Sequence, residues 1–175
     1  MTEGPLGLAS GEVRVVPYDQ RWAQLYATEA IRLTEILLLR GLQLRLEHTG
    51  STAVPGLAAK PIIDILAGRE TETSRQFFID AIQEAGYVYR GEQGIVGRDF
   101  FRKGEPRSYH IHMVSIGSEF WNEHRLFRDY LRAHRDAANE YQKLKTELVR
   151  RFPNDREAYT DAKTEFVREI LRKAQ

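Results

Sequence analysis

The chain contains one apolar run that restricts its fold more than any other feature, Pro61-Ile62-Ile63-Asp64-Ile65-Leu66-Ala67, and Gly68 follows it directly. A continuous apolar run of this length, bounded by proline and glycine, is typical of a strand buried on both faces. Proline is compatible with the first position of a strand. The run therefore predicts a buried strand, and it places a single carboxylate, Asp64, among apolar neighbours.

The remaining segments predict a sheet with helices, followed by helices alone. Apolar spacing predicts a helix from Asp19, its expected N-cap, to Gly41, and then a half-buried strand over 42–46. Further along the chain we expect a helix over 71–85, strands over 87–90, 99–103 and 109–114, and helices over 118–134, 136–151 and 155–172. This order predicts an α+β fold with a mixed β-sheet, helices on one face and a helical C-terminal third. Residues 1–12 are expected to form a flexible tail, and residues 13–175 a single domain.

The composition restricts the kinds of ligand that we expect. A formal net charge of +1 and a pI near 8.0 give no strong attraction to nucleic acid or to a membrane surface, so we expect neither as a partner and a small phosphorylated ligand instead. Because the chain has no cysteine, any metal ion must be bound by oxygen or imidazole ligands. No apolar run approaches the roughly 20 residues that cross a bilayer, which predicts a cytoplasmic protein.

The sequence His48-Thr49-Gly50-Ser51 follows the predicted strand over 42–46. A glycine after a strand lets the backbone approach a ligand closely, and the hydroxyl and N–H groups beyond it can bind phosphate oxygens. If Ser51 or Thr52 caps a short helix over 52–59, the helix dipole adds to this attraction. The alternative is a strand-to-helix turn that needs Gly50 and Ser51 only for its own backbone.

Asp64 and two histidines are the candidate metal ligands. A carboxylate buried without a partner costs on the order of several kcal/mol, so Asp64 must reach water, a cation or hydrogen-bond donors. It is therefore either a ligand for Mg²⁺ or one half of a salt bridge with Lys60 or an arginine. His110 and His112 lie two apart on a predicted strand, so both rings point to one face. They can bind a transition metal and supply acid and base, or they can be packed, hydrogen-bonded side chains.

Basic residues in and near these strands are candidate phosphate ligands. The cluster consists of Lys60, Arg98, Arg102, Lys103 and Arg107. Such a cluster can bind a polyphosphate, although loop ends are often charged simply because they are solvated. Lys163 follows Tyr159 by four residues, so its amine either enters a cleft or extends to solvent. The helical stripe of Phe120, His124, Phe127 and Leu131 is predicted to be core.

Several motifs resemble those of the GrpB family, and the resemblance extends from about Val13 to Leu171. The motifs are VxVVPYDxxW at 13–22, EHTGSTAVPGLAAKPIIDI at 47–65, GxxGRxFFRK at 94–103, HIHMV at 110–114, LFRDYLRAH at 126–134 and AYTDAKxxF at 158–166. The family is placed in the nucleotidyltransferase-like superfamily, which implies that fold here. It is also similar to a C-terminal domain fused to dephospho-coenzyme A kinase in some bacteria. This chain has no GxxxxGK[ST] phosphate loop, so it does not carry the kinase half.

The resemblance implies roles for individual residues. In the superfamily a Gly-Ser turn binds the nucleotide phosphates, and a D-x-D pair with a third acid binds metal ions. Gly50 and Ser51 match the turn and Asp64 the first acid, but Leu66 stands at the position of the second. Because residues 64 and 66 of a strand point to the same side, we expect Leu66 to face the cleft beside Asp64.

Two hypotheses follow from the resemblance. In the first, the chain transfers a nucleotidyl group from a nucleoside triphosphate to a small acceptor. Asp64 would then hold Mg²⁺, Lys60 and Arg102 would offset phosphate charge, and His110 or His112 would replace the third acid, with His112 as the base. Zn²⁺ or another transition metal at the histidine pair is the alternative metal. In the second hypothesis, the chain is a catalytically silent module that binds a nucleotide or a coenzyme A precursor and acts through a partner.

Overall fold

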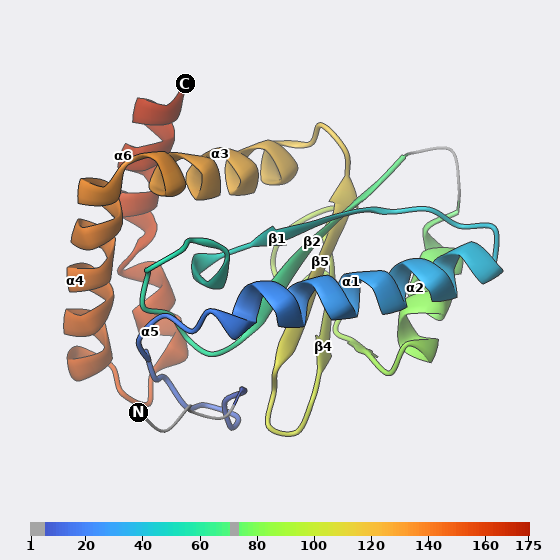
Figure 1. Cartoon of the computed structure of the whole chain (residues 1–175), viewed down its shortest axis with the longest axis horizontal. Coiled ribbons are helices and arrows are strands. Elements are labelled where there is room, and N and C mark those ends of the chain that lie inside the picture. Colours follow the sequence, from blue (N-terminus) through green and yellow to red (C-terminus); the bar gives the residue numbers. More distant parts are fainter. Residues whose placement is uncertain (1–5, 71–73) are drawn as a thin grey trace.

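The computed structural model describes residues 6–70 and 74–175, and these residues form a mixed sheet with helices (Figure 1). The elements in chain order are α1 (Arg21–Leu39), β1 (Arg45–Thr49), the 3₁₀ helix η1 (Ser51–Ala53), β2 (Ile63–Arg69), α2 (Arg75–Glu84), β3 (Val88–Tyr89), β4 (Asp99–Lys103), β5 (Tyr109–Ser115), α3 (Glu119–Ala133), α4 (Arg135–Arg151), α5 (Arg156–Asp161) and α6 (Thr164–Ala174). This arrangement confirms the predicted α+β class, the mixed sheet and the helical C-terminal third.

The five strands form one sheet in the order β1-β2-β5-β4-β3. The pair β2 and β5 is parallel, whereas β1 with β2, β4 with β5 and β3 with β4 are antiparallel. The register of the parallel pair sets Asp64 opposite His110 and Leu66 opposite His112. The two strands that carry the candidate metal ligands are therefore hydrogen-bonded neighbours inside the sheet.

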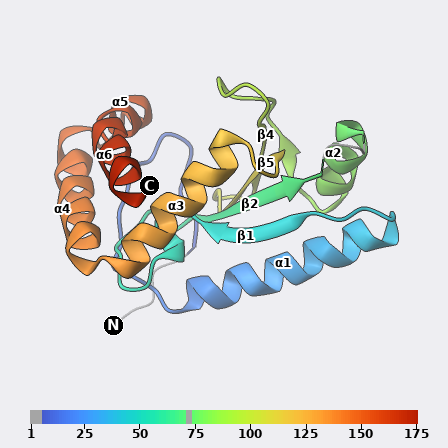
Figure 2. The same cartoon turned by 90° about the horizontal axis from the view of Figure 1, so that it is seen from above.

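Helices cover both faces of the sheet. On one face, Ile63 and Ile65 of β2 belong to a core cluster with Trp22 and Leu33 of α1 and with Phe78 of α2. On the other face, Leu66 packs against Trp121 of α3, and Figure 2 shows α1 and α3 on opposite sides of β1 and β2. The expectation of helices on one face was wrong, because strand alternation gives β2 apolar side chains on both sides.

The C-terminal helices α4, α5 and α6 lie together beside one end of the sheet in both views (Figures 1 and 2). They are joined to the sheet by a second cluster, in which Val54 and Leu57, just after η1, pack against Leu131, Ala138 and Tyr141. This contact holds α4 against the turn that follows β1. The side chains of α4 consequently reach the same region as the Gly50-Ser51 turn.

Element boundaries differ from the sequence predictions at several points. β1 begins at Arg45 rather than 42, because its pairing with β2 covers residues 45–49. The helix predicted over 155–172 is two helices, α5 and α6, and the short helix predicted over 52–59 is only the three-residue η1. The start of the helix predicted over 71–85 lies outside the described residues, and Phe77, expected on its apolar side, is exposed. Within the expected N-terminal tail, Leu8 is buried and its backbone pairs with Arg107.

Candidate functional site

A cleft of about 490 Å³ lies between the α3 side of the sheet and the C-terminal helices. Most of the sequence-predicted site residues line it: Gly50, Ser51, Thr52, Lys60, Asp64, Arg98, Arg107, His110, His112 and Lys163. The cleft is also lined by Phe100, His124, Tyr141, Lys145 and Tyr159. Residues separated by more than a hundred positions in the sequence therefore share one cavity.

Asp64, His110 and His112 form a compact group at the floor of the cleft. Oδ1 of Asp64 lies 3.0 Å from Nδ1 of His110 and 3.4 Å from Nε2 of His112, and it accepts a hydrogen bond from each nitrogen that carries a proton. One ligand atom from each residue lies within 4.8 Å of the others. This convergence is a direct result of the parallel register between β2 and β5, and it gives the group the dimensions of a three-ligand metal site.

The electrostatics of the group favour the forms that bind metals. Burial disfavours the ionised carboxylate, but the hydrogen bonds from His110 and His112 outweigh it and hold the pKa of Asp64 well below its usual range. Burial also lowers the pKa of His110, despite the nearby Asp64 carboxylate. An ionised carboxylate and a neutral imidazole are the forms that coordinate a cation.

The ligand atoms of Asp64, His110 and His112 favour some metal ions over others. Mg²⁺ prefers oxygen ligands and keeps several waters, whereas imidazole nitrogens suit Zn²⁺ and other first-row transition ions. Asp64 by itself, with phosphate oxygens and water, offers what Mg²⁺ prefers. The complete group of one carboxylate and two imidazoles fits a transition ion better than it fits Mg²⁺.

The Gly50-Ser51 turn touches this group. Gly50 has φ 70° and ψ −172°, a conformation almost restricted to glycine, and a Cβ at this position would lie 2.8 Å from Oδ2 of Asp64. The turn therefore needs glycine both for its backbone and for its close approach to the carboxylate. The Thr52 hydroxyl lies 3.0 Å from Nε2 of the buried His48, so it holds the turn in place. Because η1 has only three residues, the expected contribution of a helix dipole at this turn does not apply.

Three lysines, Lys60, Lys145 and Lys163, form a second wall of the cleft. The Nζ atoms of Lys60 and Lys163 lie 4.0 and 4.4 Å from the centre of the Tyr159 ring. Lys145, from α4, is 2% exposed, and its Nζ donates to Oγ of Ser51 at 3.1 Å and to the carbonyl oxygen of Ala58. Burial, followed by the charges of Lys163 and Lys60, lowers the pKa of Lys145 to about 7.

Lys145 was missed at the sequence level. The helical spacing indicated that this lysine is buried, because Lys145 follows Tyr141 by four residues and precedes Leu148 by three. It therefore stands on the buried stripe of α4. His124, predicted to be core, also lines the cleft, where its ring stacks on Phe120 at 3.7 Å between ring centres. Burial, and next the neighbouring His112, lowers the pKa of His124 to about 4.

Arg98 is a buried residue that lines the cleft next to His112. Its guanidinium donates to the backbone carbonyls of Glu92 and Gln93, which fixes the loop before β4, and its Nη1 lies 3.5 Å from Nδ1 of His112. With Nδ1 facing Arg98 and Nε2 facing Asp64, the His112 ring presents Nε2 to the metal-ligand group.

Two predicted phosphate ligands do not lie in the cleft. Nζ of Lys103 donates to the buried Glu29 at 2.7 Å, on the opposite side of the sheet. Lys103 lies outside the cleft because strand alternation turns its side chain away from the face that carries Phe100 and His112. Arg102 is on the cleft face, where its guanidinium lies 5.3 Å from the centre of the Phe100 ring, but it does not line the cavity.

Leu66 was predicted to face the cleft, and that prediction was also wrong. It lies on the same side of β2 as Asp64, as alternation requires, but it is 0% exposed and is covered by Trp121 of α3. Neither alternative acid replaces the missing carboxylate. Glu47 is held by Arg125 and Arg128, and Asp99 accepts from Arg75 and Tyr89 on the other side of the sheet. Among the described residues, the group at Asp64 therefore has one carboxylate.

Comparisons with known proteins agree with this architecture. The family model described as GrpB protein matches residues 12–173. The Glutamate-rich protein GrpB of Alkalihalophilus pseudofirmus is 38% identical over 173 residues, which cover 95% of this chain and 98% of that protein. The crystal structure of conserved protein GrpB from Enterococcus faecalis has a TM-score of 0.82 and 34% identity, covering 92% of this chain and 96% of that chain.

Two further proteins are more distant. A dephospho-CoA kinase of Mycolicibacterium paratuberculosis is 28% identical over 193 residues, and the match covers 95% of this chain but 47% of the kinase. The crystal structure of the Cid1 poly(U) polymerase with MgGTP bound has a TM-score of 0.55 and 13% identity, covering 78% of this chain and 45% of that chain. At that identity the likeness concerns the fold alone. Across residues 6–70 and 74–175, no helix is long and apolar enough to cross a membrane.

Proposed function

The chain belongs to the GrpB family, and we propose that it binds a nucleoside triphosphate together with a divalent metal ion and transfers the nucleotidyl group to a small acceptor. The observation that carries this proposal is the contact between the Gly50-Ser51 turn and Asp64, where a Cβ on Gly50 would meet the carboxylate at 2.8 Å. A phosphate bound by the turn lies next to a metal bound by Asp64. Metal-dependent phosphoryl chemistry requires this arrangement.

The lysine wall supplies the second requirement, positive charge for a polyphosphate. Lys60, Lys145 and Lys163 line the same cleft as Ser51, and Arg98 and Arg107 also line it. Ammonium groups offset the charge of the phosphates and of the pyrophosphate that leaves. In the proposed reaction an acceptor oxygen bonds to the α-phosphorus, the bond to pyrophosphate breaks, and the hydroxyl proton passes to water.

Asp64, His110 and His112 would hold the metal ion, which supplies charge neutralisation at the phosphates when bound. The Asp64 carboxylate is ionised across the neutral pH range because its pKa is lowered. His110 lies within hydrogen-bond reach of Asp64, so both side chains are already placed around one position. The two imidazoles favour Zn²⁺ or another transition ion over the Mg²⁺ that the sequence first suggested.

Calorimetry of a non-hydrolysable nucleoside triphosphate, with and without Mg²⁺, Mn²⁺ or Zn²⁺, tests the binding part of the proposal. We expect at least one of these metals to strengthen binding to the wild type about tenfold or more, equivalent to about 1.4 kcal/mol. Asp64→Asn should lose most of this effect. Asp136→Asn, which removes an exposed carboxylate of α4, is the matched control and should keep it. An unchanged metal effect in Asp64→Asn would show that Asp64 has a structural role.

A transfer assay tests the reaction. The wild type is incubated with an α-labelled nucleoside triphosphate and a fraction of small hydroxyl compounds, and pyrophosphate release and labelled product are measured. We expect both to depend on the added fraction and to be lost in Asp64→Asn. Metal-dependent binding without any transfer would favour a second function.

That second function is a catalytically silent module that binds a nucleotide or a coenzyme A precursor. One specific observation favours it: the position of the second acid is filled by Leu66 beneath Trp121, so a second metal ion has no carboxylate there. The similarity to about half of a dephospho-CoA kinase is the reason to include coenzyme A precursors among the ligands tested.

A further inference from the structure

Lys145 is an unusual side chain for a protein interior. It is 2% exposed, yet it lines the cleft, and its Nζ donates to the Ser51 hydroxyl and to the carbonyl oxygen of Ala58. Within residues 6–70 and 74–175, no salt bridge joins it to a carboxylate. Both of its hydrogen-bond acceptors are neutral, so a charged ammonium here lacks the partner that usually offsets burial.

The groups that face Lys145 come from several elements, and the charged ones are cations. Lys60 precedes β2 and Lys163 lies between α5 and α6, and both repel a positive charge on Lys145. Tyr141 of α4 and Tyr159 of α5 line the same part of the cleft, and burial keeps both phenols neutral, because it raises the pKa of Tyr141 to about 12 and that of Tyr159 well above its usual range. The Nζ of Lys145 lies 4.7 Å from the centre of the Tyr141 ring. Among the described residues, the hydrogen-bond acceptors of Lys145 itself are thus neutral, and the charges that act on it are positive.

We infer that Lys145 takes up a proton when a polyphosphate anion binds beside Ser51, so that ligand binding and protonation of this amine are coupled. The inference rests on the proposed function, because it assigns the terminal phosphates of the ligand to the wall formed by Lys60, Lys145 and Lys163. A phosphate placed there supplies the negative charge that the amine lacks. Burial, together with the Lys163 and Lys60 charges, keeps the pKa of Lys145 near 7 without this anion, and an adjacent anion raises it.

The contact with Ser51 links this proton to the phosphate turn. In the neutral amine, one N–H is donated to Ser51 and another to the Ala58 carbonyl. A protonated amine has a third N–H to donate, and a phosphate oxygen bound at the turn is a suitable acceptor. The protonated form of Lys145 therefore binds the ligand better than the neutral form, which makes affinity decrease as the pH rises above about 7.

Calorimetry in two buffers of different ionisation enthalpy measures this proton directly. The probes are inorganic tripolyphosphate and a non-hydrolysable nucleoside triphosphate at pH 8.0, where the lowered pKa values of His48, His110 and His124 leave those imidazoles neutral. We expect the wild type to take up close to one proton per ligand bound. The affinity should also fall by up to tenfold for each pH unit above 7.

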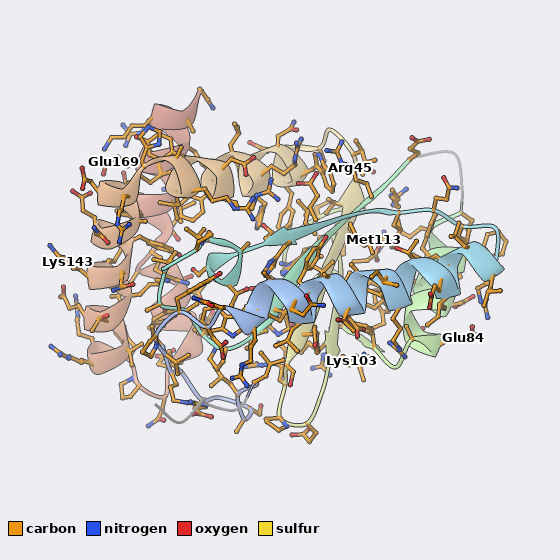
Figure 3. The ribbon with its side chains drawn as sticks, viewed as in Figure 1. Arg45, Glu84, Lys103, Met113, Lys143 and Glu169 are labelled. Atoms are coloured by element: carbon orange, nitrogen blue, oxygen red, sulfur yellow. The ribbon has the colours of Figure 1, made fainter. Side chains whose placement is uncertain are left out.

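Three variants separate the contribution of Lys145 from those of other groups. Lys145→Met should bind the probes more weakly and without the proton uptake. Lys145→Arg, whose side chain is always charged, should still bind the probes but also without the proton uptake. The control is Lys143→Met on the same helix, whose side chain lies on the outer side of α4 (Figure 3) and should leave proton uptake unchanged. Circular dichroism shows whether each variant is folded.

The outcomes distinguish this inference from the proposed function. If the probes bind to the wild type with a binding enthalpy that does not depend on the ionisation enthalpy of the buffer, the inference is overturned and the proposed function still stands. The same proton uptake in Lys145→Met as in the wild type would also overturn it, because another group would then be the acceptor. If neither probe binds to the wild type with or without metal, the proposed function fails and this inference fails with it.

Discussion

Replacing Lys145 with methionine should remove a rise of stability with pH. Methionine is about as long as lysine and suits the buried site, where Lys145 is 2% exposed. Because burial and the charges of Lys163 and Lys60 lower the pKa of Lys145 from 10.5 to about 7, the unfolded chain binds more protons than the folded protein between these two pH values. Stability therefore rises with pH across this window in the wild type.

The magnitude follows from proton linkage. One proton bound only by the unfolded state gives a slope of about 1.4 kcal/mol per pH unit. At pH 7 the folded amine is about half protonated, so the slope there is about half of this value. Integrated from pH 7 to pH 9, the wild type gains about 2 kcal/mol from Lys145 alone. The variant lacks this contribution, and tyrosine ionisation affects both proteins almost equally up to pH 9.

Urea denaturation at pH 7, 8 and 9 measures the difference. With a slope of about 2 kcal/mol per molar urea, the midpoint of the wild type should rise by about 1 M relative to that of the variant over this range. Lys143→Met, an exposed change on the same helix, should follow the wild type. Parallel pH profiles for the wild type and Lys145→Met would refute the reasoning, since they would mean that Lys145 stays charged in the folded protein.

Three further substitutions test other parts of the structure. Leu66→Asp should destabilise the protein by about 3 kcal/mol or more and should not strengthen metal binding, because Leu66 is 0% exposed. Urea denaturation with and without metal measures both effects, and a small loss of stability that added metal reverses would contradict the expectation. Gly50→Ala should lower the stability by about 1–3 kcal/mol because of the backbone conformation at this position, and should reduce the strengthening of ligand binding by metal because it displaces Asp64. An unchanged metal dependence of ligand binding in calorimetry would contradict the close contact between Gly50 and Asp64. Lys103→Met should reduce the thermal stability, because Glu29 loses an ion pair at 2.7 Å, and should leave triphosphate affinity unchanged; a large loss of affinity would return Lys103 to the site.

Local sequence patterns predicted the elements that depend on local residues. The apolar run with Asp64 and the His110-x-His112 spacing predicted two strands, and alternation correctly gave the two histidines a common face. The glycine at position 50 also indicated a turn with close backbone approach, which the positive φ and the contact with Asp64 explain.

What the sequence did not predict depends on long-range packing. Alternation placed Leu66 on the face of Asp64, but only the position of α3 determines that Trp121 covers it. Lys145 stands 94 residues from Ser51 and 87 residues from Ala58, and in the sequence a buried lysine on an apolar stripe resembles one that extends to solvent. The pairing of Lys103 with Glu29 likewise spans 74 residues and depends on how α1 lies on the sheet.

The most direct test of the proposed site is a crystal structure of the protein with a non-hydrolysable nucleoside triphosphate and Mn²⁺ or Zn²⁺, with the metal located by anomalous scattering. The proposal predicts one metal peak bounded by Asp64, His110 and His112, with the triphosphate bound along the Gly50-Ser51 turn and its terminal phosphates at Lys145. A metal peak elsewhere, or a triphosphate bound outside this cleft, would contradict it.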